Sequence, residues 1–138
     1  GVVKSEDGVA FEEPEVVLRA GGGDALDGAY VGSPCAVLAE SSEGRGILFV
    51  YYTARNKAGK QAISMAARFL DEPGEALEKS GAAMYGPAGS VEPREPSVVR
   101  FDTFTLLFTS QKPAKNSTDV VVTVGVSPGD VELPPARP

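Results

Sequence analysis

The side chains that carry most enzyme chemistry are scarce in this chain. It contains no His and a single Cys among 138 residues, which excludes the commonest general base and the usual zinc clusters. It also has no Trp, which argues against a carbohydrate-binding module. Chemistry would therefore fall to carboxylates, and glycoside cleavage needs two of them at a set separation. We expect no cofactor and no metal.

Several other polar residues have simpler interpretations than a site. Residues 21–24, Gly-Gly-Gly-Asp, predict a flexible turn, because no helix start with Lys-Ser/Thr follows as a phosphate loop would require. Asp24 and Asp27 are expected to be turn residues. Cys35 lies in an apolar run and is expected to be a small buried side chain. Four lysines in two matching loops predict a solvated rim: Lys57, Lys60, Lys112 and Lys115.

Two stretches of the chain have the same order of residue types. The strands that they predict must position the residues of any catalytic or binding site. The first, residues 32–68, begins at Ser33-Pro34, and the second, residues 94–127, begins at Glu95-Pro96. Each continues with a short apolar run, a turn, an aromatic-rich run ending in Thr, a polar loop and a run of small residues. We align Tyr52 and Thr53 with Phe108 and Thr109. Such a repeat predicts blocks that need neighbours to bury their faces.

The residue pattern predicts an all-β chain. Strands are expected over 35–39, 47–53, 82–85 and the matching parts of the second unit, where β-branched and aromatic residues are dense. Residues 61–70 also fit a helical stripe, but their repeat partner, 119–126, is rich in Val, so we favour a strand over 61–67. Residues 11–18 predict an edge strand or one that starts after Pro14, and 131–133 a last short strand.

Composition restricts the partners. The net charge is −6 and the isoelectric point about 4.7, which disfavours nucleic acid and anionic lipid. The longest apolar run, residues 47–52, is far shorter than the roughly 18 residues that span a bilayer, so no membrane insertion is expected. The sequon at Asn116 matters only in a secreted protein. Gly1 without an initiator Met suits an imported organellar chain, for example in a plastid, and suits an incomplete N-terminus equally well.

The repeat resembles the blades of the five-bladed β-propeller glycoside hydrolases and fructosyltransferases, which include arabinanases, invertases and levansucrases. The stretches GSPCAVL, ILFVYYTAR, ISMAAR and EPSVVRFDTFTLLFTSQ carry the resemblance, over roughly residues 11–133. Phe11 and Leu77 stand where the outer strand of such a blade usually opens with Trp. The resemblance implies two consecutive antiparallel propeller-like blades, an incomplete propeller, because the family needs about five.

The resemblance also implies where catalytic acids would stand. Arg94-Glu95-Pro96 is similar to the Arg-Asp-Pro element of the invertase and levansucrase branch, whose acid stabilises the transition state. Glu95, with Arg94, is therefore the candidate for a catalytic-type carboxylate. Ser33, at the other x-Pro position, cannot act as an acid. One carboxylate is not the pair that the chemistry needs, so no catalytic residue is assigned.

These observations lead to a domain division and two functional hypotheses. Residues 1–10 are expected to form a flexible arm, 11–133 a two-blade β domain and 134–138 a Pro-rich tail. The favoured function is a non-catalytic accessory subunit that docks onto a larger protein assembly, or onto further copies, through its blade faces and loops. The alternative is a fragment of a five-bladed glycoside hydrolase or fructosyltransferase acting on carbohydrate.

Overall fold

The computed structural model of the chain describes residues 1–72, 76–85, 92–101, 104–112 and 121–128. These residues form seven strands and no helix, which confirms the prediction of an all-β chain. The strands are β1 (Tyr30–Glu40), β2 (Gly46–Arg55), β3 (Gln61–Phe69), β4 (Glu78–Tyr85), β5 (Glu92–Arg100), β6 (Phe104–Lys112) and β7 (Val121–Pro128).

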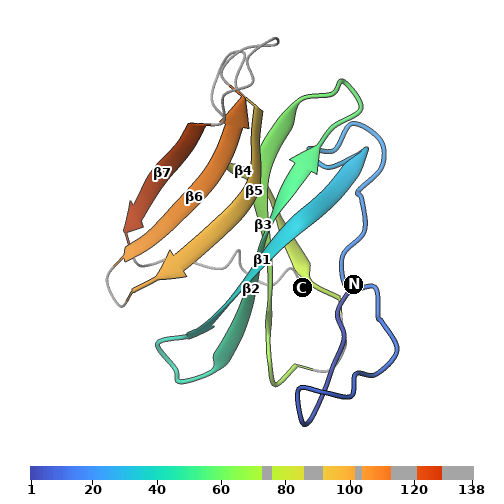
Figure 1. Cartoon of the computed structure of the whole chain (residues 1–138), viewed down its shortest axis with the longest axis vertical. Coiled ribbons are helices and arrows are strands. Elements are labelled where there is room, and N and C mark those ends of the chain that lie inside the picture. The colour runs from blue at the N-terminus through green and yellow to red at the C-terminus, as the bar shows by residue number, and fades with distance from the viewer. Residues whose placement is uncertain (73–75, 86–91, 102–103, 113–120, 129–138) are drawn as a thin grey trace.

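The strands form two antiparallel sheets that follow one another in the chain. The N-terminal sheet has the order β1-β2-β3-β4 and the C-terminal sheet the order β5-β6-β7, so each strand pairs with its neighbour in sequence. Strand β5 lies against β1, β2 and β3 and joins the two sheets in space (Figure 1). The prediction of two consecutive antiparallel sheets is therefore confirmed.

The segment with two interpretations, residues 61–70, forms strand β3 as far as Phe69. It pairs with β2 without interruption from Arg55↔Gln61 to Ile47↔Phe69. Six consecutive residues, 62–67, are buried. Such a run is typical of a strand covered on both faces, and it mimics a helical stripe because its apolar residues do not alternate with polar ones.

The front face of the N-terminal sheet packs on the C-terminal sheet. We use this name for the face formed by Ile47, Phe49, Tyr51, Ile63, Met65 and Ala67. It contacts Val98 of β5 and Leu107 of β6, which lie on the back face of the C-terminal sheet. Thr105 and Thr109 alternate with the outward residues of β6 and are buried on the same back face. The main core therefore lies between the two sheets.

The back face of the N-terminal sheet is covered by the chain that precedes β1 and by Leu77, which lies just before β4. This face carries Val50, Tyr52, Ala54 and Ala66, and its cover is made by Val17, Leu18, Leu26 and Leu77. The Leu77 N–H donates to the Val17 carbonyl at 3.1 Å, and the Ala29 N–H to the Arg55 carbonyl at 2.9 Å. These bonds attach an irregular segment to the end of β2 and to the residue that precedes β4.

Both sheets contain the same irregularity at the start of their first strand. One extra residue interrupts the register between Gly32 and Cys35 in β1, and again between Arg94 and Ser97 in β5. Within each bulge the residue before proline has a positive φ, 48° at Ser33 and 53° at Glu95. This conformation is unfavourable for any residue with a Cβ, and more so before proline. The repeat is therefore one of backbone geometry as well as sequence.

The register corrects the alignment of the second strands by one residue. Cys35 pairs with Tyr51 and Ser97 with Phe108, so Tyr51 corresponds to Phe108. We had matched Phe108 with Tyr52. A shift of one residue exchanges the two faces of a strand, and the wrong match arose because Tyr-Thr and Phe-Thr look alike in sequence. The match of the third strands agrees with the pairing, since Met65 faces Tyr51 and Val124 faces Phe108.

Other expectations were wrong or remain predictions. Residues 11–18 form no strand, because Pro14 lacks an N–H for a ladder, and they contribute one isolated bridge, Val2↔Glu15. Strand β4 starts before the expected residue 82. The predicted strand at 131–133, the sequon at Asn116, Lys115 and the tail at 134–138 lie outside the described residues. The expected division into domains stays a prediction.

The strained bulge makes a prediction about Ser33, which is exposed. Ser33→Val is expected to destabilise the fold by about 1 kcal/mol, because a β-branched residue tolerates positive φ poorly. Ser33→Gly is expected to leave stability unchanged or to raise it by at most about 1 kcal/mol. Urea unfolding of the two variants checks this. Equal stability of the two variants would contradict the backbone strain.

Candidate functional site

The predicted candidate, Glu95, lies in the bulge of β5 with its side chain exposed. Its N–H crosses to the other sheet and donates to the Thr53 Oγ1 at 3.0 Å. Its carboxylate Oε2 accepts a hydrogen bond from the Ser110 Oγ at 2.8 Å. The bulge thus holds the carboxylate at the end of the sheets where β1 and β5 begin.

Arg94 lies beside Glu95 in sequence, but its ion pair is with a different acid. Its Nη2 is 3.5 Å from the Glu92 Oε2, and the same oxygen accepts a hydrogen bond from the Gln61 Nε2 at 3.2 Å. The Arg94 Nε is buried and has no hydrogen-bond partner. The structure therefore places Arg94 and Glu95 on one edge but does not join them in the ion pair that a cooperating site would show.

This edge has limited chemical capacity. The corresponding bulge of β1 offers the hydroxyl of Ser33 in place of a second acid, as the sequence indicated. A lone carboxylate held by a serine can accept hydrogen bonds from a hydroxyl-rich or cationic group. It does not supply the acid and base pair of glycoside hydrolysis.

A buried polar cluster that the sequence did not reveal lies on the back face of the N-terminal sheet. Asp27, whose side chain is 6% exposed, forms an ion pair with Lys79 at 2.6 Å. The Tyr52 hydroxyl donates to the Asp27 Oδ2 at 3.3 Å, and the Gly21 N–H donates to its Oδ1 at 3.1 Å. Together with Ser64 these groups line a pocket of about 200 Å³.

The environment of this cluster raises the pKa of Tyr52 above its ordinary value of 10.0. Burial is the main cause, and the charge of Asp27 adds to it. Because the cation and the anion of the cluster already face each other, no charged group is left to act on a substrate. We therefore interpret the cluster as an attachment between the segment before β1, the centre of the sheet and strand β4.

The prediction that Asp27 is a turn residue missed this role. Asp24, by contrast, is exposed in the turn as expected. The partner Lys79 is remote in sequence, and nothing in the spacing of Asp27 and Tyr52 indicates that their side chains meet. Cys35 is half-buried, packs beside the front face and accepts the Val98 N–H at its sulfur at 3.3 Å. Lys57 and Lys60 are exposed, as a solvated rim requires.

A second, apolar pocket of about 280 Å³ lies on the back face beside β1. Its lining includes Val17, Leu18, Val31, Pro34 and Ala36. None of the side chains that line it is charged. The pocket exists because the irregular segment before β1 covers β2 and β3 more closely than β1, where Leu38 remains exposed.

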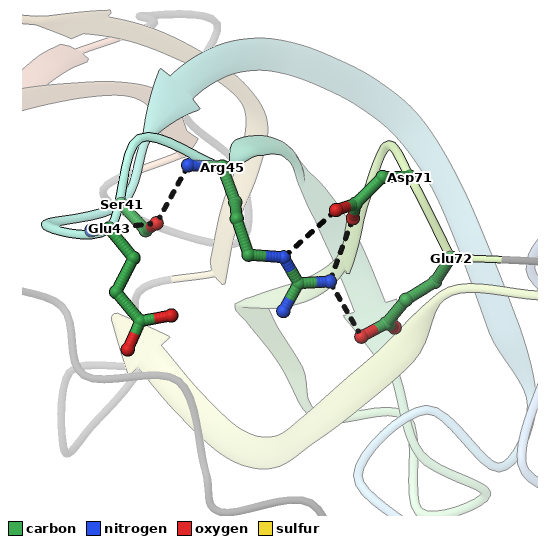
Figure 2. A network of polar contacts seen from close by, with 5 residues as sticks. All are labelled: Ser41, Glu43, Arg45, Asp71 and Glu72. Atoms are coloured by element: carbon green, nitrogen blue, oxygen red, sulfur yellow. Dashed lines mark hydrogen bonds and ion pairs between the residues drawn. The ribbon is translucent and has the colours of Figure 1, made fainter.

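A polar network on the surface closes the turn between β1 and β2. Figure 2 shows Arg45 pointing at Asp71 and Glu72 beyond the end of β3, while the side chain of Glu43 points away. The Arg45 Nε and Nη2 donate to the two carboxylate oxygens of Asp71 at 3.0 and 2.7 Å, and its guanidinium carbon lies 3.7 Å from the Phe69 ring centroid. The Arg45 hydrogen bonds lower the pKa of Asp71 below its usual range. The Arg45 guanidinium is already paired with side chains of this chain, so the network joins the β1–β2 turn to the residues after β3 and has a structural role.

The front face of the C-terminal sheet is apolar and partly exposed. It carries Val99 and Leu106, which are cross-strand partners, and Phe108. At the β5–β6 turn Phe101 and Phe104 stack with ring centroids 4.5 Å apart. Val99 is 44% and Phe101 46% exposed. Exposed apolar residues that are contiguous in this way mark interaction surfaces more often than single ones do.

Comparison with known proteins gives no family. No protein-family profile matches the chain, and no curated protein or solved structure matches it. Among the described residues, no cluster of His, Cys, Asp and Glu could hold a metal ion. That part of the chain also lacks any helix of the length and hydropathy that a membrane span needs.

Proposed function

We propose that the chain is a non-catalytic accessory module that docks onto a larger protein assembly. The observation that carries this proposal is the exposed apolar front face of the C-terminal sheet, with Val99 44% and Phe101 46% exposed. Such a face is stabilised by removal from water, at about 25 cal/mol for each Å² of apolar surface buried. The first part of β5, which contains the bulge, offers the carboxylates of Glu92 and Glu95 at the rim of the same surface.

We further propose that the two sheets are blades of an incomplete β-propeller. The support is the repeated bulge at Ser33 and Glu95, the simple strand order within each sheet and the packing of the front of one sheet on the back of the next. Propeller blades cover each other's faces in this manner. Two blades leave one face uncovered, which is consistent with docking.

The alternative function is a fragment of a five-bladed glycoside hydrolase or fructosyltransferase. One observation favours it: Glu95 stands in a strained backbone conformation, and such strain gathers at functional sites. Ser33 has the same strain without an acidic group. Strain at both positions is accounted for by the bulge itself, so docking remains the better supported function.

An affinity experiment tests the proposed function. Tagged chain is incubated with extract of its native cells, and a retained protein is identified, purified and rebound. We expect Glu95→Gln to bind as the unaltered chain does, since the carboxylate lies outside the apolar face. Phe101→Asp is expected to weaken binding at least about tenfold, because it places a charge on that face.

Two results would reject the docking function. One is a chain that retains no protein, and the other is retention that Phe101→Asp does not weaken. The enzyme alternative has its own assay, the hydrolysis of aryl glycosides by the purified chain. Activity that disappears in Glu95→Gln would establish the alternative in place of docking.

A further inference from the structure

We propose that the front face of the C-terminal sheet binds one specific kind of surface, the back face of another antiparallel sheet of the same repeat type. That sheet belongs to a separate partner protein. Its back face would pack on the front face of the C-terminal sheet, as the back face of the C-terminal sheet packs on the front face of the N-terminal sheet within this chain. The inference rests on the proposed docking function and names the chemistry of the partner.

The exposed face of the C-terminal sheet is the repeat equivalent of a more deeply buried face of the N-terminal sheet. By register, Val37 and Phe49 of the N-terminal sheet correspond to Val99 and Leu106 of the C-terminal sheet. Phe49 is 2% exposed because the C-terminal sheet covers it, whereas its equivalent Leu106 is half-buried. Val37 is half-buried and packs on the core, whereas its equivalent Val99 is 44% exposed. The same side of the repeat is thus more exposed in the second copy than in the first.

Hydrogen bonds cross the interface between the two sheets. Thr53 accepts the Glu95 N–H at 3.0 Å, and Cys35 accepts the Val98 N–H at 3.3 Å, so side chains on the front satisfy the bulge of the following sheet. The register equivalents of Thr53 and Cys35 are Ser110 and Ser97. Both have a hydroxyl oxygen that accepts hydrogen bonds, and Ser97 is exposed. The C-terminal sheet therefore carries acceptors where a following bulge would need them.

The existing interface also defines the complementary surface. The back face that covers Phe49 presents the aliphatic side chains of Val98 and Leu107 and the buried Thr105. It also presents Arg100, whose guanidinium carbon lies 5.5 Å from the Phe49 ring centroid. The front face of the C-terminal sheet is aromatic in the same way. Its partner should therefore offer small aliphatic side chains and Thr, a bulge with free N–H groups and a cation at the margin.

Among the described residues, a second copy of this chain offers such a surface only in part. The back face of its C-terminal sheet is occupied by its own N-terminal sheet. The centre of the back face of its N-terminal sheet is held closed by Leu77, Leu18 and the buried Asp27–Lys79 ion pair, and only the margin along β1, where Leu38 is 67% exposed, remains open. Tyr52 at the centre of that face is 2% exposed. The two ends of the pair differ, because the N-terminal end is covered over its centre and the C-terminal end is more exposed, and this asymmetry points to a different protein.

The test supplies a sheet of the stated kind. Residues 92–128 are added as a further copy after residue 138 of the full chain, through a flexible Gly/Ser linker long enough to reach the front face. The chain itself carries Cys35→Ser and Ser97→Cys, so that its only thiol lies on the front face. The matched control has Val98→Asp in the added copy alone, which leaves the chain unaltered and places a charge on the docking surface.

We expect the added copy to slow labelling of the thiol by a maleimide at least about tenfold, because the docked sheet must open before reagent enters. The control is expected to label as fast as the chain without an added copy. Equal labelling with and without the added copy overturns the proposal, as does equal protection by the control. Labelling of the chain alone that slows as its concentration rises also overturns it, because a second copy would then be the occupant. If a partner is captured from extract but the added sheet does not protect the thiol from labelling, the docking function is supported and only this inference is rejected.

Discussion

Phe49→Ala is expected to destabilise the protein by about 3–5 kcal/mol, which is the usual cost of removing a fully buried aromatic ring. Phe49 is 2% exposed and lies between the sheets, where the Arg100 guanidinium faces its ring at 5.5 Å. Small domains are stable by about 5–15 kcal/mol in total, so the variant should lose a large part of its stability. Guanidinium unfolding followed by circular dichroism measures this, since the chain has no Trp for fluorescence.

The matched control for this prediction is Phe101→Ala. Phe101 is the same residue type on the equivalent side of the second sheet, but it is 46% exposed. Its loss should cost at most about 0.5–1 kcal/mol, because most of the ring already contacts water. If both variants lose the same stability, the assignment of one face as buried and the other as open is wrong.

Lys79→Met is expected to destabilise the protein by about 3 kcal/mol, because it leaves a buried carboxylate without its cation. The Asp27 side chain is 6% exposed, and Lys79, 26% exposed, reaches it at 2.6 Å. The remaining bonds, from the Gly21 N–H and the Tyr52 hydroxyl, are longer and neutral. The expected readout is a lower urea midpoint at neutral pH.

A second variant separates loss of charge pairing from loss of packing. In Lys79→Met with Asp27→Asn the buried charge is gone, so most of the lost stability should return. A double variant as unstable as Lys79→Met alone would mean that the lost stability comes from the packing of the Lys79 side chain and not from its charge. Because the cluster attaches the segment before β1, proteolysis of that segment should accelerate in Lys79→Met and recover in the double variant.

The pattern of residues determined the secondary structure and the repeat. The dense Val, Ile, Tyr and Phe of residues 47–53 and the Val-rich equivalent of 61–67 were enough to predict strands, because β-branched and aromatic side chains fit a pleated surface. The repeated x-Pro at Ser33 and Glu95 marked the start of each unit. The structure places the same bulge at both positions.

The tertiary structure alone decided which faces meet and which side chains cooperate. Sequence similarity matched Tyr52 with Phe108, whereas the bulge register matches Tyr51 with it, and one residue exchanges the faces of a strand. Asp27 meets Lys79 only because the segment before β1 folds back over the sheet to which β4 belongs. Local pattern fixes the conformation of a segment, because backbone sterics act between neighbouring residues, but contacts between remote segments depend on how the whole chain packs. For that reason the open front face, on which the functional proposal depends, emerged from the fold and not from the residues that could do chemistry.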